Sequence, residues 1–118
     1  MKNFKIVWSS STECGPSREK NEDSIFPPLS GSDYPPFRAA VCDGLGGHTS
    51  GDIASKIAVD SLLKNFKDLN SLINSANDEI IEYQNHNPKT TGMGTTMTAI
   101  TIGSDALMKI GHVGDSRC

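Results

Sequence analysis

The chain has 118 residues, of which 36% are hydrophobic and 21% are charged, and its formal net charge is -3. This composition is typical of a soluble globular domain or part of one, and the lack of a basic stripe argues against nucleic acid as a partner. The sequence shows no signal-peptide core and no membrane-spanning stretch, so we expect a cytoplasmic protein without membrane contact. The three cysteines, Cys14, Cys42 and Cys118, have no C-x-x-C spacing, which predicts reduced thiols.

The first part of the chain predicts short strands. Alternating apolar residues favour a strand over residues 4–8, and a second short strand is expected over residues 24–26. Two proline pairs bracket a predicted loop around Gly31, because proline cannot donate to a sheet ladder. Residues 37–42 then form an apolar strand that leads into Asp43.

The rest of the chain predicts two helices and a hairpin. A helix begins near Thr49, which has the capping-box spacing to Asp52. Apolar residues at three- and four-residue steps predict a second helix over residues 69–83. Strands over residues 95–102 and 106–113 are joined by a Gly-Ser-Asp turn. Strands, then two helices, then a hairpin predict an α+β fold with antiparallel sheets.

The glycine-rich segment after the third predicted strand carries the first candidate site. Asp43 precedes three glycines, and glycine lets the backbone approach a ligand closely. Carboxylate and carbonyl oxygens suit Mg²⁺ or Mn²⁺. The alternative is a strand-to-helix turn in which Asp43 only satisfies nearby N–H groups. The dinucleotide fingerprint would need glycine at Thr49 and the P-loop would need lysine at Asp52, so nucleotide binding is not indicated.

Further charged residues support a phosphoryl hydrolase. Asp115 repeats the pattern of Asp43, since each lies just past an apolar strand and next to a glycine. Glu22 and Asp23 add two carboxylates, and Arg18 is the cation near them. Carboxylates bind metal ions that activate water, and the arginine fork binds phosphate oxygens. The alternative is a set of ordinary loop charges.

The chain contains four glycine-containing motifs, which are, in order, GPSREKNED (residues 15–23), DGLGGH (43–48) followed by Gly51, Ala54 and Ser55, GTT (94–96) and GDSR (114–117). In this order they resemble the signature motifs of the metal-dependent protein phosphatases of the type 2C (PPM) kind. The Asn-Glu-Asp and Gly-Gly-His variants resemble the bacterial branch. Four matches in one order are much more specific than any one of them.

The resemblance implies an antiparallel β-sandwich flanked by helices, with metal ions at one end. By this resemblance, Asp43 bridges two Mn²⁺ or Mg²⁺ ions and the Gly44 carbonyl completes one ligand shell. Asp115 matches a position that helps to hold a third, weaker ion in some members. Glu22 and Asp23 would hold water molecules beside the ions.

The resemblance also implies the reaction. A metal-activated water would hydrolyse phosphoserine or phosphothreonine in proteins, with Arg18 binding the substrate phosphate. The expected partners are phosphoproteins, the products of a Ser/Thr kinase. Some relatives have a histidine where this chain has Leu45, and His48 is expected to be structural, so the general acid is left unassigned.

The family domain is considerably longer than this chain. Residues 1–118 are therefore expected to be the N-terminal portion of a single phosphatase domain, cut after the Gly-Asp-Ser-Arg motif and inactive alone. The alternative is a non-catalytic truncated module that binds phosphoprotein or a regulator through Arg18. A metal-binding protein unrelated to phosphatases is a third hypothesis, and it requires the Arg18 and Asp115 matches to be coincidental.

Overall fold

The computed structural model describes residues 3–46 and 50–118. Its strands are β1 (Ile6–Trp8), β2 (Asp23–Phe26), β3 (Gly31–Asp33), β4 (Phe37–Leu45), β5 (Gly94–Thr95), β6 (Met97–Ile102) and β7 (Met108–Val113). The helices are α1 (Gly51–Asp60) and α2 (Leu69–His86), with short 3-10 turns η1 (Ser61–Leu63) and η2 (Pro88–Thr90). All strand pairs are antiparallel, which confirms the predicted α+β class. None of the helices in the described ranges combines the length and apolarity needed to span a membrane.

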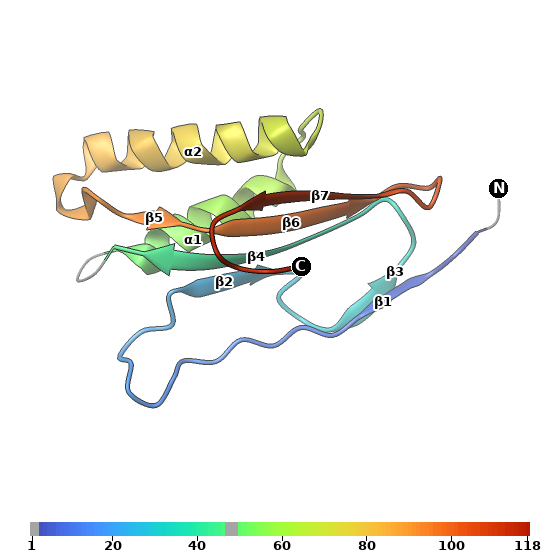
Figure 1. Ribbon diagram of the computed structural model, residues 1–118, viewed down its shortest axis with the longest axis horizontal. Helices are drawn as coiled ribbons and strands as arrows, with labels where there is room; N and C mark the ends of the chain where they lie inside the picture. The colour runs from blue at the N-terminus through green and yellow to red at the C-terminus, as the bar shows by residue number, and fades with distance from the viewer. Residues whose placement is uncertain (1–2, 47–49) are drawn as a thin grey trace.

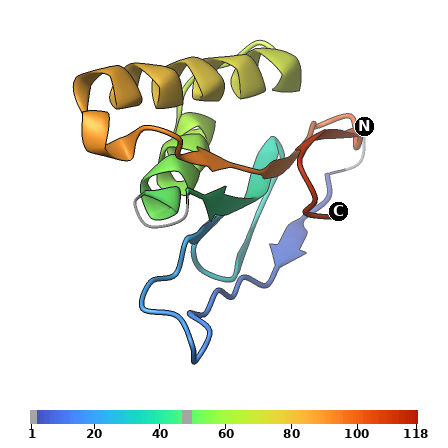
Figure 2. The same ribbon diagram turned by 60° about the vertical axis from the view of Figure 1, so that its left-hand side comes forward.

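The main sheet has the strand order β2-β4-β6-β7, and β5 pairs with the end of β4. Both helices pack on one face of this sheet, α1 against β2 and β4 and α2 against β6 and β7 (Figures 1 and 2). Side chains from both layers interlock in the main core. Its buried members are Ala40, Cys42, Ala58, Val59, Leu62, Leu69, Leu72, Ala76, Met97 and Ala99.

Helix α2 follows the predicted periodicity closely. It begins at Leu69, and the Asp68 carboxylate caps it by accepting the Ser71 N–H at 2.8 Å. Leu72 and Ala76 are buried one turn apart, so the apolar stripe faces the sheet.

The segment between the proline pairs contains strand β3, which the sequence had predicted to be a loop. β3 pairs with β1 to form a two-stranded ribbon on the side of the main sheet away from the helices (Figure 2). Trp8 anchors this ribbon, because its ring lies 4.8 Å from the ring of Phe37 and its Nε1 donates to the Leu29 carbonyl at 2.8 Å.

Two strand boundaries differ between the prediction and the structure, and both lie at the candidate site. Strand β4 runs on to Leu45, so Asp43 lies within a strand and not beyond its end. The predicted strand over residues 95–102 is interrupted at Thr96, between β5 and β6. The predicted cap at Thr49 and the predicted structural role of His48 lie outside the described residues.

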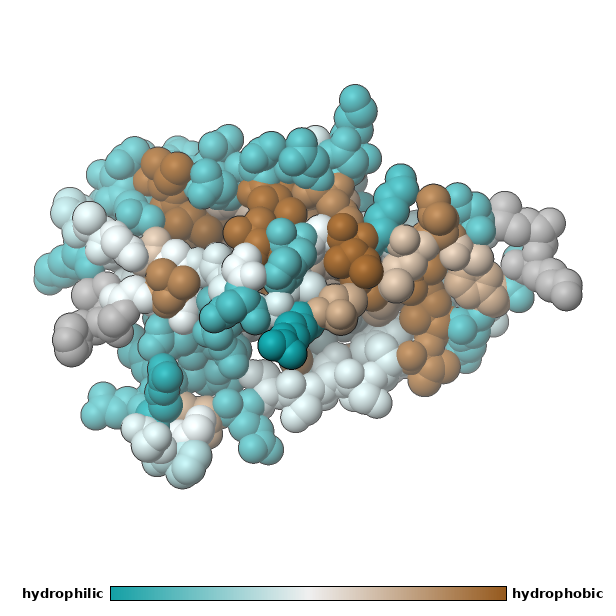
Figure 3. All heavy atoms as spheres, in the orientation of Figure 1, coloured by the Kyte–Doolittle hydropathy of each residue, from teal (hydrophilic) through white to brown (hydrophobic). Residues whose placement is uncertain are grey.

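The sheet face opposite the helices is largely apolar. Cross-strand pairing places Ile25 beside Val41 and Ile100 beside Ile110 on this face. Val41 and Ile110 are each about half exposed. Figure 3 shows hydrophobic side chains reaching the surface along β7. A groove of about 410 Å³ runs between this face and the β1 segment, and Arg117 lines it together with Trp8.

Candidate metal and phosphate site

Strands β2 and β4 bring two acidic side chains together. Their antiparallel register places Asp23 directly opposite Asp43, so both carboxyl groups leave the same face of the sheet. The pKa of Asp23 is raised above its usual value, first by partial burial, then by the hydrogen bond and the charge of Asp43. The two residues lie opposite each other because β2 pairs with β4, although β3 comes between these strands in the sequence.

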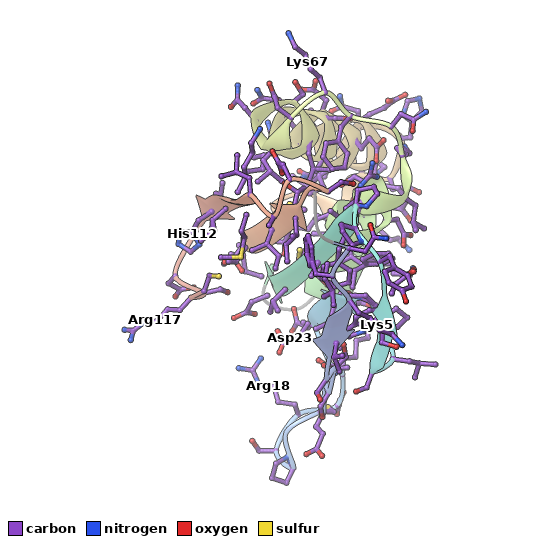
Figure 4. All side chains as sticks on the ribbon, turned by 90° about the vertical axis from the view of Figure 1, so that its right-hand side faces the viewer. Lys5, Arg18, Asp23, Lys67, His112 and Arg117 are labelled. Carbon is purple, nitrogen blue, oxygen red and sulfur yellow. The ribbon has the colours of Figure 1, made fainter. Side chains whose placement is uncertain are left out.

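Arg18 lies on the loop before β2, close enough to Asp23 for its positive charge to lower the pKa of that carboxyl. Figure 4 shows both residues on the side of the molecule away from Lys67. The Arg18 side chain is 70% exposed, and its Nη1 lies 3.9 Å from Oε1 of Glu22. A turn holds the backbone at this point, because the Arg18 N–H donates to the Gly15 carbonyl at 3.0 Å. The guanidinium is therefore accessible to a ligand from solvent.

Glu22 connects the first motif to the second through its main chain. Its carbonyl accepts the Gly44 N–H at 3.0 Å and the hydroxyl of buried Ser55 at 2.7 Å. The Glu22 carboxylate lies over the start of α1, since a Cβ built on Gly51 would be 2.0 Å from Oε2. A carboxylate beside the first turn of a helix is favoured by the free N–H groups there.

The contact between Gly44 and Gly51 explains two of the glycines in the motif. A Cβ on Gly44 would lie 2.0 Å from the carbonyl oxygen of Gly51. Only hydrogen fits in this space, so the two glycines let α1 begin directly against β4. The glycines act by close packing, and they bring the first turn of α1 against the β4 residue that follows Asp43 in sequence.

Thr96 joins the third and fourth motifs to Asp43. Its main-chain N–H donates to the Asp43 carbonyl at 2.9 Å, and its Oγ1 accepts the Asp43 N–H at 3.0 Å. The same hydroxyl is 2.9 Å from Oγ of Ser116, the residue after Asp115. Thr96 belongs to the predicted GTT motif, but its link to Asp43 was not predicted from the sequence. The run of threonines could have indicated it, because a threonine hydroxyl can replace a main-chain group as hydrogen-bond partner.

The donor set fits a hard divalent cation. Asp23 and Asp43 face each other. Besides burial, the charges of Asp43 and Glu22 raise the pKa of Asp23, whereas the charge of Arg18 lowers it. A bound cation would relieve the repulsion between the two carboxylates. Carboxylate and carbonyl oxygens are the donors that Mn²⁺ and Mg²⁺ prefer. Within residues 3–46 and 50–118, no group of three or more His, Cys, Asp or Glu side chains is arranged to hold a metal ion. The metal-binding roles of Asp43, Gly44 and Asp115 therefore remain predictions.

Comparison with known proteins agrees with the resemblance to phosphatases. The serine/threonine phosphatase PstP of Mycobacterium tuberculosis is 30% identical over 121 residues, covering 95% of this chain. The Stp phosphatase of Listeria monocytogenes is 34% identical over 90% of the chain. The chain is a homologue of bacterial serine/threonine phosphatases. The predicted resemblance is thereby confirmed, although no protein-family model matches the chain.

Solved structures support the same relationship. A crystal structure of the Mycobacterium tuberculosis phosphatase PstP/Ppp matches 98% of this chain with a TM-score of 0.69 and 27% sequence identity. A structure of the PstP catalytic domain in complex with two manganese ions matches 98% of the chain with a TM-score of 0.63 and 28% identity. The chain spans 22% of the PstP sequence and 46% of the Stp sequence, and about half of each structure.

Proposed function

We propose that this chain forms part of the active site of a metal-dependent phosphatase that hydrolyses phosphoserine and phosphothreonine in proteins. The observation that carries the proposal is the pairing of Asp23 with Asp43 beside Arg18. Hydrogen bonds connect this pair to the remaining motifs through Glu22 and Thr96. The homology to serine/threonine phosphatases supports the same reaction.

The acidic residues have separate roles in this proposal. The Asp43 carboxylate and the Gly44 carbonyl hold Mn²⁺ or Mg²⁺, and Asp115 contributes to a further ion. Glu22 and Asp23 accept hydrogen bonds from water beside the ions and keep that water oriented. When bound, the metal supplies an activated water as nucleophile and neutralises charge on the phosphoryl group. The PstP structure with two manganese ions supports a two-ion site.

Arg18 is the proposed phosphate ligand. The Nη1 of its exposed guanidinium lies 3.9 Å from Oε1 of Glu22, and this long contact leaves its donors available to two phosphate oxygens at once. The substrates would be phosphoproteins produced by a Ser/Thr kinase, in the cytoplasm. Arg18 orients the phosphoryl group, and the acidic residues orient the attacking water.

The chain spans less than half of each of these curated relatives, so we propose that it is the N-terminal portion of a single phosphatase domain. Further metal ligands would come from regions of the relatives that it does not span. The 118-residue chain should then bind Mn²⁺ without turning over substrate. Mn²⁺-dependent hydrolysis of a phosphothreonine peptide by this chain would contradict the partial-site proposal.

Calorimetric titration with Mn²⁺ tests the metal site. Asp43→Asn should lower the affinity by at least about tenfold, since it removes the ligand charge at the centre of the site. Asp78→Asn is the matched control, because it makes the same change on the exposed side of α2 and should leave affinity unchanged. Equal affinity of the wild type and Asp43→Asn would refute the assigned role.

The exposure of Arg18 also favours the second candidate, a non-catalytic module that binds phosphoprotein. Fluorescence anisotropy with a labelled phosphothreonine peptide separates the two. Arg18→Ala should weaken peptide binding in either case and should leave Mn²⁺ binding intact. In the phosphatase, Asp43→Asn should also abolish any Mn²⁺-dependent part of peptide binding. Peptide binding that depends on Arg18 but not on Mn²⁺ or Asp43 would favour the binding module.

A further inference from the structure

The hydrogen bonds of Thr96 replace part of the sheet ladder. The register on either side, Val41 with Thr98 and Gly44 with Thr95, places Thr96 opposite Asp43. In a regular antiparallel pair the two residues would exchange both main-chain hydrogen bonds. Here the Asp43 N–H is accepted by the side-chain Oγ1 of Thr96, while the Thr96 carbonyl accepts the Thr95 hydroxyl at 2.8 Å. The Asp43 N–H therefore depends on one side-chain hydroxyl, whereas the Asp43 carbonyl keeps its main-chain hydrogen bond from the Thr96 N–H.

The same hydroxyl reaches the segment that carries Asp115. Thr96 Oγ1 lies 2.9 Å from Ser116 Oγ, so a continuous path of two hydrogen bonds links the Asp43 N–H to Ser116. The methyl group of Thr96 also contacts this segment, since a Cβ on Gly114 would lie 2.5 Å from Thr96 Cγ2. Thr96 is only 6% exposed, so water does not compete freely for these contacts.

We propose that Thr96 is a positioning residue that fixes Asp43 and the Asp115 segment relative to each other and thereby sets metal affinity. This inference rests on the proposed function, because it assumes that both carboxylates serve the metal site. A residue that orients metal ligands by hydrogen bonding commonly changes affinity ten- to a hundredfold when it is replaced. The hydroxyl of Thr96 is the group that carries the effect.

Three variants separate the hydroxyl from the shape of the side chain. Thr96→Val keeps the volume but removes the hydroxyl, and Thr96→Ser keeps the hydroxyl. Ser116→Ala breaks only the second hydrogen bond. Each variant is compared with the wild-type 118-residue chain for its circular dichroism spectrum, its hydrogen exchange at the Asp43 amide by NMR and its Mn²⁺ affinity by calorimetry.

We expect the Asp43 amide of Thr96→Val to exchange at least about tenfold faster than in the wild type, with Mn²⁺ affinity about tenfold lower. Thr96→Ser should restore both values. Ser116→Ala should keep the Asp43 amide protected but should bind Mn²⁺ several-fold more weakly, because only the Asp115 segment is released. This pattern is not expected of a residue that merely stabilises the fold.

If Thr96→Val folds and its Asp43 amide exchanges as slowly as in the wild type, Thr96 does not fix the main chain of Asp43. If that amide exchanges faster but Mn²⁺ affinity equals that of the wild type, the proposed effect on metal binding is wrong. If Thr96→Val does not fold, wild-type Mn²⁺ affinity in Ser116→Ala would refute the connection to Asp115. Failure of the wild-type chain to bind Mn²⁺ would contradict the proposed function itself. The exchange measurement would then still decide whether Thr96 holds the main chain of Asp43.

Discussion

The contact between β4 and the start of α1 gives a steric prediction for Gly44→Ala. The new Cβ would lie 2.0 Å from the Gly51 carbonyl oxygen and 2.6 Å from the Glu22 carbonyl oxygen. Ordinary contact begins at 3.4 Å, so the shortest of these distances is about 1.4 Å too small. The three nearest atoms all belong to the backbone, and rotation of a side chain cannot relieve these clashes.

We expect this substitution to lower the free energy of unfolding by about 3 kcal/mol, the upper part of the range for overpacking. For a domain of this size, that corresponds to a fall of roughly 12 °C in Tm. The backbone of Gly44 is outside the left-handed region, so the whole effect comes from the clash and not from backbone strain.

Urea unfolding followed by circular dichroism measures the change. Gly15→Ala is the matched control, because its Cβ would have its nearest neighbour at 3.8 Å and its backbone is also outside the left-handed region. The control should stay within about 0.5 kcal/mol of the wild type. If Gly44→Ala is as stable as Gly15→Ala, the close contact of β4 and α1 is wrong.

Two further predictions concern single side chains. Burial raises the pKa of the Cys42 thiol to about 12, whereas Cys14 and Cys118 are exposed. Titration with a thiol reagent at pH 8 should therefore modify two cysteines in the folded chain and three in guanidinium. Rapid reaction of all three cysteines without denaturant would contradict the buried position of Cys42. Asp68 has its pKa lowered by its hydrogen bond with Ser71. Its contribution to stability is present above the unfolded pKa of 3.8 and is lost as pH falls through the lower folded value. Between pH 6 and pH 2 the wild type should thus lose more stability in urea unfolding than Asp68→Asn, which caps α2 without ionising, and equal losses would exclude this role of the Asp68 charge.

Much of the local structure follows from the sequence. The spacing of apolar residues predicted α2 from Leu69, because a helix buries one stripe of every turn and the signal is local. β-Branched residues and a Gly-Ser-Asp turn predicted the β6–β7 hairpin for the same reason. The ordered motifs identified the relationship to phosphatases and the candidate residues Arg18, Glu22 and Asp43, although their roles remain predictions.

The tertiary structure decided how the motifs meet. Strand β3 has little strand propensity, and it forms because β1 lies beside it, so its sequence alone predicted a loop. The pairing of Asp23 with Asp43 depends on the register of β2 against β4, which no local pattern specifies. The hydrogen bonds from Thr96 to Asp43 and Ser116 join segments more than 15 residues apart. The sequence by itself thus determined α2, the β6–β7 hairpin and the motif residues. The long-range strand pairing determined which motif residues lie together, because contacts between distant segments arise only when the sheet is assembled.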